Sequence, residues 1–287
     1  MLISGKTKII GIFGDPIKHT LSPHMHNSAF EHMGLDYAYL PFHVKDNKLK
    51  EAVESIRALN LRGVNITVPH KEEVMQYLDE LDEQAEHIGS VNTIVNEEGT
   101  LKGYNTDGRG YIRSLEEETG IELENSNIVV MGAGGSARSI LVALITKHPK
   151  EISLVNRTLS RAEKLVEEFQ KHAPNTKLKA LSATDGLFGH EIEEANLFVN
   201  TTVMGMSEVE LPPVPLEHLP PRAVISDIVY SPINTPIIKE AEAMGFTVHR
   251  GIGMLVYQGA IGFELWTGKA APVSVMKTAA LKHLNKD

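Results

Sequence analysis

The sequence predicts an α/β protein with largely parallel β-structure, and three observations support this. Short apolar runs alternate with stretches whose apolar residues recur at helical spacing. Strands separated by helices form βαβ units, whose strands pair in parallel. A glycine-rich turn, Gly132–Ser136, joins one apolar run to a helical stretch. At 287 residues the chain is about twice the roughly 150 residues of a typical domain, so two domains fit.

The first half contains four apolar runs that we expect to be strands: Lys8–Gly14, Tyr37–Phe42, Gly63–Thr67 and Val91–Val95. Between the second and the third, Asp46–Leu59 has apolar residues at spacings of four, three and three from Leu49 onward. This spacing places them on one face of a helix. The first half therefore alternates between strand and helix.

The segment Gly103–Gly108 interrupts the alternation, and Asn105 or Thr106 can cap a helix that runs through Arg113 to about Glu118. We expect a domain hinge here, with residues 1–107 before it and residues 108–251 in a second domain. The second domain has five expected strands: Asn127–Met131, Glu151–Val155, Leu197–Asn200, Ala223–Val229 and Phe246–His249. Two expected helices follow, Met254–Trp266 and Val273–Leu284. Their periodicity leaves open which domain they pack on.

Composition excludes several classes of protein. With 28 Lys and Arg against 37 Asp and Glu, the formal net charge of −9 repels nucleic acids and anionic membranes. A chain without Cys forms no disulfides, thiolate zinc sites or iron–sulfur clusters and has no Cys nucleophile. Met1–Gly11 lacks the apolar core of a signal peptide, and no run approaches the ~18 apolar residues of a membrane span. We expect a soluble, cytoplasmic protein that binds neither nucleic acid nor membrane.

Two other sites are not expected in the N-terminal region. Five histidines are close together in the sequence: His19, His24, His26, His32 and His43. On a helix, His24 and His26 point in different directions, and no carboxylate stands at metal-ligand spacing, so we expect no metal. Ser22 lacks the context of a nucleophile elbow, so acyl transfer is not expected either.

The glycine-rich turn predicts a binding site for a dinucleotide. An expected helix, Ser139–Lys147, follows five small residues: Gly132, Ala133, Gly134, Gly135 and Ser136. In such a turn one glycine allows the tight bend and another lets the backbone approach a pyrophosphate, which the helix N-terminus attracts. Ala137 holds the third position, which accepts Gly or Ala. The alternative is a tight turn without a ligand.

The end of the next expected strand favours NADP(H) over NAD(H). An NAD site would have Asp or Glu here to bind the ribose 2′-hydroxyl. This chain has instead Asn156, Arg157, Thr158 and, one helical turn on, Arg161. Guanidinium groups match a 2′-phosphate in shape and charge. The alternative is that these arginines are solvated and pair with Glu163 or Glu167.

In the first half, polar residues repeatedly follow expected strands, at the end where open α/β sheets bind ligands. They belong to a set of seven motifs: Thr20–Asn27, Gly63–Lys71, Gly89–Thr93, Gly103–Gly108, Gly132–Ser136, Asn156–Arg161 and Gly251–Gln258. In this order, and covering nearly the whole chain, the motifs resemble those of the shikimate dehydrogenase family.

The resemblance implies the reversible, NADPH-dependent reduction of 3-dehydroshikimate to shikimate, a step of chorismate and aromatic amino acid biosynthesis. It also implies an N-terminal α/β substrate domain, residues 1–107, that the C-terminal helices 252–287 complete. The NADP-binding domain, residues 108–251, would be Rossmann-like with a parallel sheet. Lys71 matches the catalytic lysine and Asp107 its partner. An ammonium beside the carbonyl would stabilise and protonate the developing alkoxide. Without the resemblance, the favoured interpretation of Lys71 would be a pair with Glu72 or Glu73.

The resemblance also assigns binding positions. Thr20 and Ser22 match a pair of hydroxyls that bind the substrate carboxylate, and Tyr230 matches a tyrosine near that carboxylate. The positions that match substrate-hydroxyl ligands are Asn65, Thr67, Asn92 and Gln258. Besides the glycine turn and Asn156–Arg161, the cofactor positions are Ile228 and Gly251 at the nicotinamide and, as a weaker match, Glu83.

One departure keeps an alternative open. The family usually has Ser where this chain has Thr20, and the added methyl stiffens the side chain, so discrimination against quinate is in doubt. A quinate/shikimate dehydrogenase with broader substrate or cofactor use is therefore the first alternative. A non-catalytic NADP-binding regulator should have lost Lys71 or Asp107, and a methylene-folate dehydrogenase would not need this set of hydroxyls and amides. The sequence does not decide the oligomeric state, and a homodimer is possible.

Overall fold

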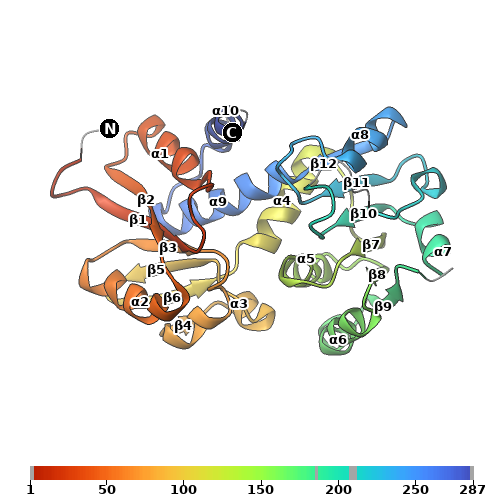
Figure 1. Cartoon of the computed structure of the whole chain (residues 1–287), viewed down its shortest axis with the longest axis horizontal. Coiled ribbons are helices and arrows are strands. Elements are labelled where there is room, and N and C mark those ends of the chain that lie inside the picture. The colour runs from red at the N-terminus through yellow and green to blue at the C-terminus, as the bar shows by residue number, and fades with distance from the viewer. Residues whose placement is uncertain (1–2, 185–186, 207–211, 285–287) are drawn as a thin grey trace. The chain divides into compact units, whose positions relative to one another are not determined.

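The computed structural model describes residues 3–184, 187–206 and 212–284, so the ends of the expected first domain lie outside the described residues. It divides into two compact units: residues up to Gly110 together with those from Val256, and residues Tyr111–Leu255. Each unit has its own six-stranded sheet (Figure 1). The divisions fall inside two helices, three and four residues beyond the expected boundaries at 107 and 251.

The sheet of the first unit is mixed, with three parallel and two antiparallel strand pairs. Its strand order is β2-β1-β3-β5-β6-β4. The strands are β1 (Lys8–Gly14), β2 (Tyr37–His43), β3 (Gly63–Ile66), β4 (Glu80–Leu81), β5 (Thr93–Glu97) and β6 (Thr100–Tyr104). β1 pairs in parallel with β2 and β3, whereas β5 is antiparallel to β3 and β6. Glu98 and Gly99, both with positive φ, form the two-residue turn that makes β5 and β6 a hairpin.

Helices cover both faces of this sheet (Figure 1). On one face α2 packs its apolar stripe, Leu49, Val53 and Ile56, against β3 and β5. On the other face α1 contacts α10, and Trp266 of α9 donates from Nε1 to the carbonyl of Ile94 at 2.9 Å. The helical segments are α1 (Ser22–His32), η1 (Asp46–Lys48), α2 (Leu49–Ala58), η2 (Glu73–Tyr77), α3 (Glu83–Ile88) and α10 (Val273–Leu284), with part of α4 (Asp107–Thr119) and of α9 (Gly251–Thr267).

The second unit has an all-parallel sheet with the order β12-β11-β10-β7-β8-β9. Its strands are β7 (Asn127–Met131), β8 (Glu151–Asn156), β9 (Lys177–Ser182), β10 (Leu197–Asn200), β11 (Val224–Asp227) and β12 (Thr247–Arg250). The chain goes outward from β7 to β9 and then returns to β10 on the other side of β7. This reversal is the topological switch point at which doubly wound sheets bind ligands.

Two apolar clusters cover the two faces of the second sheet. One includes side chains of α4, α5 and α6, and the other includes side chains of α7 and α8. The helical segments are α5 (Gly135–Ile145), α6 (Leu159–Phe169), η3 (Gln170–His172), α7 (Leu187–Glu193), η4 (Leu216–His218) and α8 (Pro236–Ala243). None of the helices in the described part of the chain is long and apolar enough to cross a membrane.

The bounds of several elements are as expected, and others differ. The strands at Lys8–Gly14, Asn127–Met131 and Leu197–Asn200 and the helix Val273–Leu284 have the predicted bounds. The helices α5 and α9 begin earlier than expected, at Gly135 and Gly251. Each begins with a glycine, which is a poor helix former, so the sequence pattern does not mark these starts. We did not expect β4, β6 or β9. In β9 lysines alternate with apolar residues, and both lysines pair with Glu151 of the neighbouring strand.

Candidate active site

Lys71 and Asp107 form an ion pair in the first unit. Lys71 Nζ lies 2.6 Å from Asp107 Oδ2, and the side chains are 30% and 14% exposed. Asp107 opens α4, where the helix dipole favours a carboxylate. Among the described residues Lys71 does not pair with Glu72 or Glu73, the alternative that the sequence left open. An ammonium is a donor only, so Lys71 can still donate to a second acceptor from this fixed position.

The turn that carries Lys71 is anchored from both sides. The backbone N–H of His70 donates to the carbonyl of Thr67 at 3.0 Å, and the Nε2 of His70 donates to the carbonyl of Val44 at 2.7 Å. Thr67 packs over Gly14, where a Cβ atom would lie 2.3 Å from the Thr67 methyl group. A glycine at position 14 is therefore required for Thr67 to keep its place on this turn.

Asn92 fixes the other side of the Asp107 carboxylate. Its Oδ1 accepts from the backbone N–H of Thr106 at 2.8 Å, and an N–H can only donate. The amide is therefore oriented with Nδ2 toward Asp107, at 2.7 Å from Oδ1. Asp107 thus accepts a hydrogen bond on each oxygen, one from Lys71 and one from Asn92. Gln258, on α9, has its Oε1 3.4 Å from the same Nδ2.

Asn65 is buried and connected to Asn92 by hydrogen bonds. Its Nδ2 donates to the backbone carbonyl of Asn92 and to the Thr93 hydroxyl, both at 3.0 Å. Its Oδ1 accepts from the Tyr39 hydroxyl at 2.6 Å. Thr93 in turn donates to Asn92 Oδ1 at 3.1 Å. Sequence reasoning missed Tyr39, Thr93 and Thr106 as part of this network. The last two stand beside predicted site residues in their motifs, whereas no sequence signal marks Tyr39.

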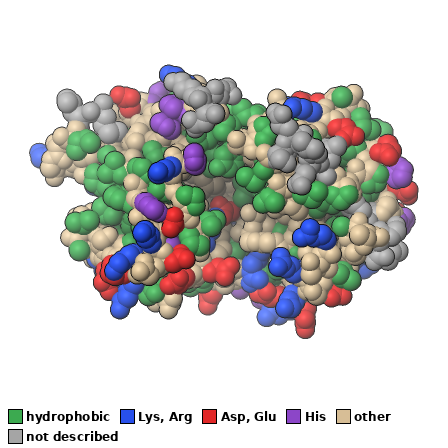
Figure 2. Space-filling model, viewed as in Figure 1, with side chains coloured by type: hydrophobic (Ala, Val, Ile, Leu, Met, Phe, Trp, Pro, Cys, Tyr) green, Lys and Arg blue, Asp and Glu red, His purple; other side chains and the backbone are tan. Residues whose placement is uncertain are grey.

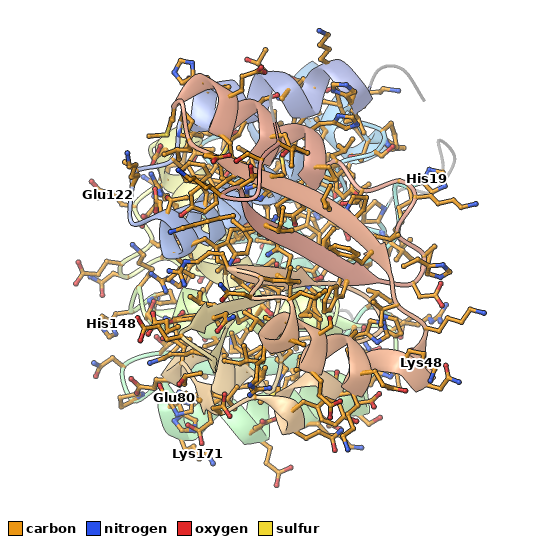
Figure 3. The ribbon with its side chains drawn as sticks, turned by 90° about the vertical axis from the view of Figure 1, so that its left-hand side faces the viewer. His19, Lys48, Glu80, Glu122, His148 and Lys171 are labelled. Carbon is orange, nitrogen blue, oxygen red and sulfur yellow. The ribbon has the colours of Figure 1, made fainter. Side chains whose placement is uncertain are left out.

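Thr20 and Ser22 lie at the start of α1, in the same unit. The Ser22 backbone N–H donates to the Thr20 hydroxyl at 3.3 Å. Ser22 is 6% exposed, whereas Thr20 is half-buried. His19, which precedes Thr20, lies at the surface (Figure 3), and the described residues contain no group of three or more His, Cys, Asp or Glu side chains that could hold a metal.

The glycine-rich turn of the second unit exposes the N-terminus of α5. Gly132 has a φ of 116°, and a Cβ atom there would lie 2.3 Å from Thr201 Oγ1, so the position requires glycine. Ala133 is half-buried, and Gly134, Gly135 and Ser136 are exposed. Among the residues that the structure describes, no side chain caps this helix. This cradle of small residues and uncapped N–H groups fits a pyrophosphate.

The segment after β8 presents two cations. Arg157, Thr158 and Arg161 are exposed, and Asn156 Nδ2 donates to the Thr158 carbonyl at 2.8 Å, which shapes the turn. Neither arginine forms an ion pair with any described residue, so the predicted alternative of a pair with Glu163 or Glu167 is not seen in the described part of the chain. Figure 2 shows Lys and Arg side chains gathered over the part of the second unit that carries α5 and α6.

The remaining predicted residues are divided between the units. Tyr230, Ile228 and Gly251 belong to the second unit, and Glu83 opens α3 in the first. Burial raises the pKa of Tyr230, so its hydroxyl stays protonated. A Cβ atom at Gly251 would lie 2.3 Å from the carbonyl oxygen of Ile228. Only glycine therefore lets α9 begin so close to the loop that follows β11.

Sequence reasoning also missed Asp227, which organises the loops after β10 and β11. Its buried carboxylate accepts from Thr235 Oγ1 at 2.7 Å and from Asn200 Nδ2 and the Val229 N–H, both at 3.0 Å. Burial raises the pKa of Asp227. These bonds hold the segment that carries Ile228 and Tyr230. The sequence places Asp227 two residues before the end of the expected strand Ala223–Val229, and a polar residue so near a strand end could have marked it.

Three family models match the chain. The shikimate dehydrogenase substrate binding domain matches residues 12–94, the shikimate / quinate 5-dehydrogenase model matches 114–203, and the shikimate 5′-dehydrogenase C-terminal domain matches 251–281. A shikimate dehydrogenase (NADP(+)) from Alkaliphilus metalliredigens is 43% identical over 281 residues, which cover 97% of this chain and 98% of that protein.

Two solved structures are similar over nearly the full length. The shikimate 5-dehydrogenase of Listeria monocytogenes, in complex with shikimate and NAD, has a TM-score of 0.91 and 41% identity and covers 96% of this chain and 97% of its own. The quinate dehydrogenase of Corynebacterium glutamicum, in complex with NAD, has a TM-score of 0.87 and 28% identity, with coverages of 96% and 99%. The same fold is therefore found in a protein named for shikimate and in one named for quinate, and both of these structures contain NAD.

Proposed function

Because this chain belongs to the shikimate dehydrogenase family, we propose that it catalyses the reversible, NADP-dependent reduction of 3-dehydroshikimate to shikimate in aromatic amino acid biosynthesis. The observation that carries the proposal is the Lys71–Asp107 pair at 2.6 Å, held by Asn92. A ketone reductase needs a proton donor beside the carbonyl oxygen, and Lys71 is a positioned ammonium.

In the proposed mechanism, NADPH supplies the hydride when bound. Lys71 donates a hydrogen bond to the carbonyl oxygen, stabilises the negative charge that develops there and gives it a proton. Asp107 holds the ammonium in place through Oδ2, and Asn92 keeps the carboxylate oriented through Oδ1. In the direction of oxidation the same groups act in reverse, with Lys71 receiving the proton of the hydroxyl.

We assign the rest of the substrate contacts by the chemistry of each group. The hydroxyls of Thr20 and Ser22 donate to the substrate carboxylate, with Tyr230 as a third donor. The substrate hydroxyls bind to Asn65, Thr67, Asn92 and Gln258. Asn92 also donates a hydrogen bond to Asp107. The substrate-binding domain in this proposal is residues 1–107 with 252–287, and the NADP-binding domain is residues 108–251.

The cofactor contacts follow from the second unit. The pyrophosphate binds the backbone of Gly132–Ser136 at the uncapped start of α5. The 2′-phosphate binds to Arg157, Thr158 and Arg161, which lie on the turn that Asn156 shapes. The nicotinamide is bordered by Ile228 and Gly251. Glu83 is the weakest assignment, because it stands in the other unit. We further propose a cytoplasmic enzyme, with a homodimer as the assembly to test by sedimentation.

One experiment separates this function from its alternatives. NADPH and NADH oxidation are followed in parallel with 3-dehydroshikimate and with 3-dehydroquinate. Of the four pairs of cofactor and substrate, we expect rapid turnover only with NADPH and 3-dehydroshikimate. Comparable turnover with 3-dehydroquinate would favour the broader quinate/shikimate enzyme, for which Thr20 is the motivating residue. No turnover with any pair would favour the non-catalytic regulator.

A further inference from the structure

Tyr39 is held in one position by residues of α1. It lies in the middle of β2 and is 1% exposed. Its backbone N–H donates to Asn27 Oδ1 at 2.8 Å, and its carbonyl accepts from Asn27 Nδ2 at 3.0 Å. Its ring stacks on the ring of His26, with centroids 4.5 Å apart and planes inclined by 6°. These contacts fix both the backbone and the ring, and so they fix the place of the hydroxyl.

The direction of each hydrogen bond at this hydroxyl can be assigned. Asn65 Nδ2 faces the backbone carbonyl of Asn92, which only accepts, so Asn65 Oδ1 is the atom that faces Tyr39. The hydroxyl of Tyr39 is therefore the donor. Burial raises the pKa of Tyr39, which keeps that proton in place.

We propose that Tyr39 is a positioning residue that holds Oδ1 of Asn65 in place, so that Asn65 meets the substrate as an acceptor. Both Nδ2 hydrogens of Asn65 are used by Asn92 and Thr93, and one lone pair of Oδ1 is used by Tyr39. A single Oδ1 lone pair remains. Asn65 then accepts from an alcohol and cannot donate to a ketone, so it selects a non-reacting hydroxyl. The inference rests on the proposed function, which gives Asn65 a substrate contact.

The test is Tyr39→Phe, which removes the hydroxyl and keeps the stacked ring. We expect the KM for shikimate to rise about 2- to 12-fold, the effect of one hydrogen bond between uncharged groups. Since the Lys71–Asp107 pair is intact, kcat should stay within about twofold, and the KM for NADP should not change. Tyr37→Phe is the matched control, because Tyr37 lies on the same strand and its hydroxyl has no hydrogen-bond partner among the described residues.

A double mutant separates positioning from a merely structural role. If Tyr39 acts through Asn65, Tyr39→Phe with Asn65→Ala should have the same KM for shikimate as Asn65→Ala alone. Additive effects, or a lower melting temperature and kcat with an unchanged KM, would overturn the inference. If the wild-type enzyme oxidises shikimate and Tyr39→Phe has the same KM for shikimate, the inference is overturned and the proposed function stands. Wild-type enzyme that neither binds nor oxidises shikimate would overturn both.

Discussion

The candidate residues of the two units differ in how they are held. In the first unit Lys71, Asp107, Asn92 and Asn65 are buried or half-buried and hydrogen-bonded to one another. In the second unit the glycine turn and the arginines after β8 are mostly exposed, and the arginines pair with no described residue. One site is a connected network and the other a set of independent groups. Substitutions should therefore be strongly coupled in the first unit and nearly additive in the second.

The largest effect is expected at Lys71. Lys71→Met keeps the stem without the charge, so we expect kcat to fall by about 10²- to 10⁴-fold while NADP affinity is nearly intact. Because the residues act as a unit, the double variant with Asp107→Asn should be no slower than Lys71→Met alone. Single-turnover NADPH oxidation at saturating substrate measures this. A Lys71→Met rate within about threefold of wild type would remove Lys71 from the chemistry.

The second unit gives the contrasting prediction. Each charge-assisted bond to a phosphate contributes about 1.5–3 kcal/mol, so Arg157→Ala should weaken NADP binding about 10- to 150-fold and leave NAD binding little changed. Arg222→Ala, an exposed arginine elsewhere in the same unit, is the control. Calorimetric titration with both cofactors checks this. Equal losses for NADP and NAD would refute the phosphate assignment.

Two buried histidines, one in each unit, extend the comparison to stability. His249 bonds to the hydroxyls of Ser114 and Ser226, at 2.7 and 2.9 Å. Neither ring nitrogen of His26 has a hydrogen-bond partner among the described residues, and burial lowers the pKa of His26 to about 3. Between pH 6.5 and 3 the unfolded chain binds the proton that folded His26 refuses. The free energy of unfolding therefore falls as the pH falls through this window.

From pH 7 to pH 5 His26 alone should lower the free energy of unfolding by roughly 2 kcal/mol. His26→Phe keeps a ring against Tyr39 and should remove this part of the pH dependence. Urea unfolding of both proteins at the two pH values measures it. If the variant lost as much stability as wild type between pH 7 and pH 5, folded His26 would not be excluding the proton.

The smallest effect is expected at Thr20, because the substrate carboxylate keeps Ser22 and Tyr230 as donors. Thr20→Val keeps the shape and deletes one donor to that carboxylate, so the KM for shikimate should rise about 10-fold, the lower end for a hydrogen bond to a charged group. Thr20→Ser should change the KM for shikimate less. It should also change the ratio of kcat/KM for shikimate to kcat/KM for quinate. Steady-state kinetics with both substrates decide this. A Thr20→Val enzyme equal to wild type in KM and kcat/KM would exclude a carboxylate contact.

The sequence predicted the regular parts of the fold well and the local exceptions poorly. Strands buried on both faces, such as β7 and β10, are continuous apolar runs, so their bounds could be predicted. The hairpin β5–β6 could not, because its turn is Glu98-Gly99 and its second strand contains Lys102 and Gly103. Edge strands such as β9 bury less and therefore leave a weaker pattern.

The candidate site shows the same limit. Lys71 and Asp107 could be paired before the structure only through the family resemblance, because they are far apart in sequence. The hydrogen bonds of Tyr39 and Thr93 depend on which side chains the sheet places next to one another. No local pattern encodes that. Motifs thus mark the residues of a site, while the orientation of its amides comes from tertiary structure.

The hydrogen bonds between Asn27 and the backbone of Tyr39 also affect how this chain can associate with another copy. β2 is an edge strand, and an edge with free N–H groups invites pairing with another chain. Along its outer side, the N–H of Tyr37 donates to Leu35 O, the N–H of Tyr39 donates to Asn27, and Pro41 has none. From Tyr37 to Pro41, the outer side of this described strand offers no free donor to an incoming strand. Pairing of this strand with another chain through the backbone donors of Tyr37–Pro41 is therefore not expected, in a homodimer or in an amyloid-like stack.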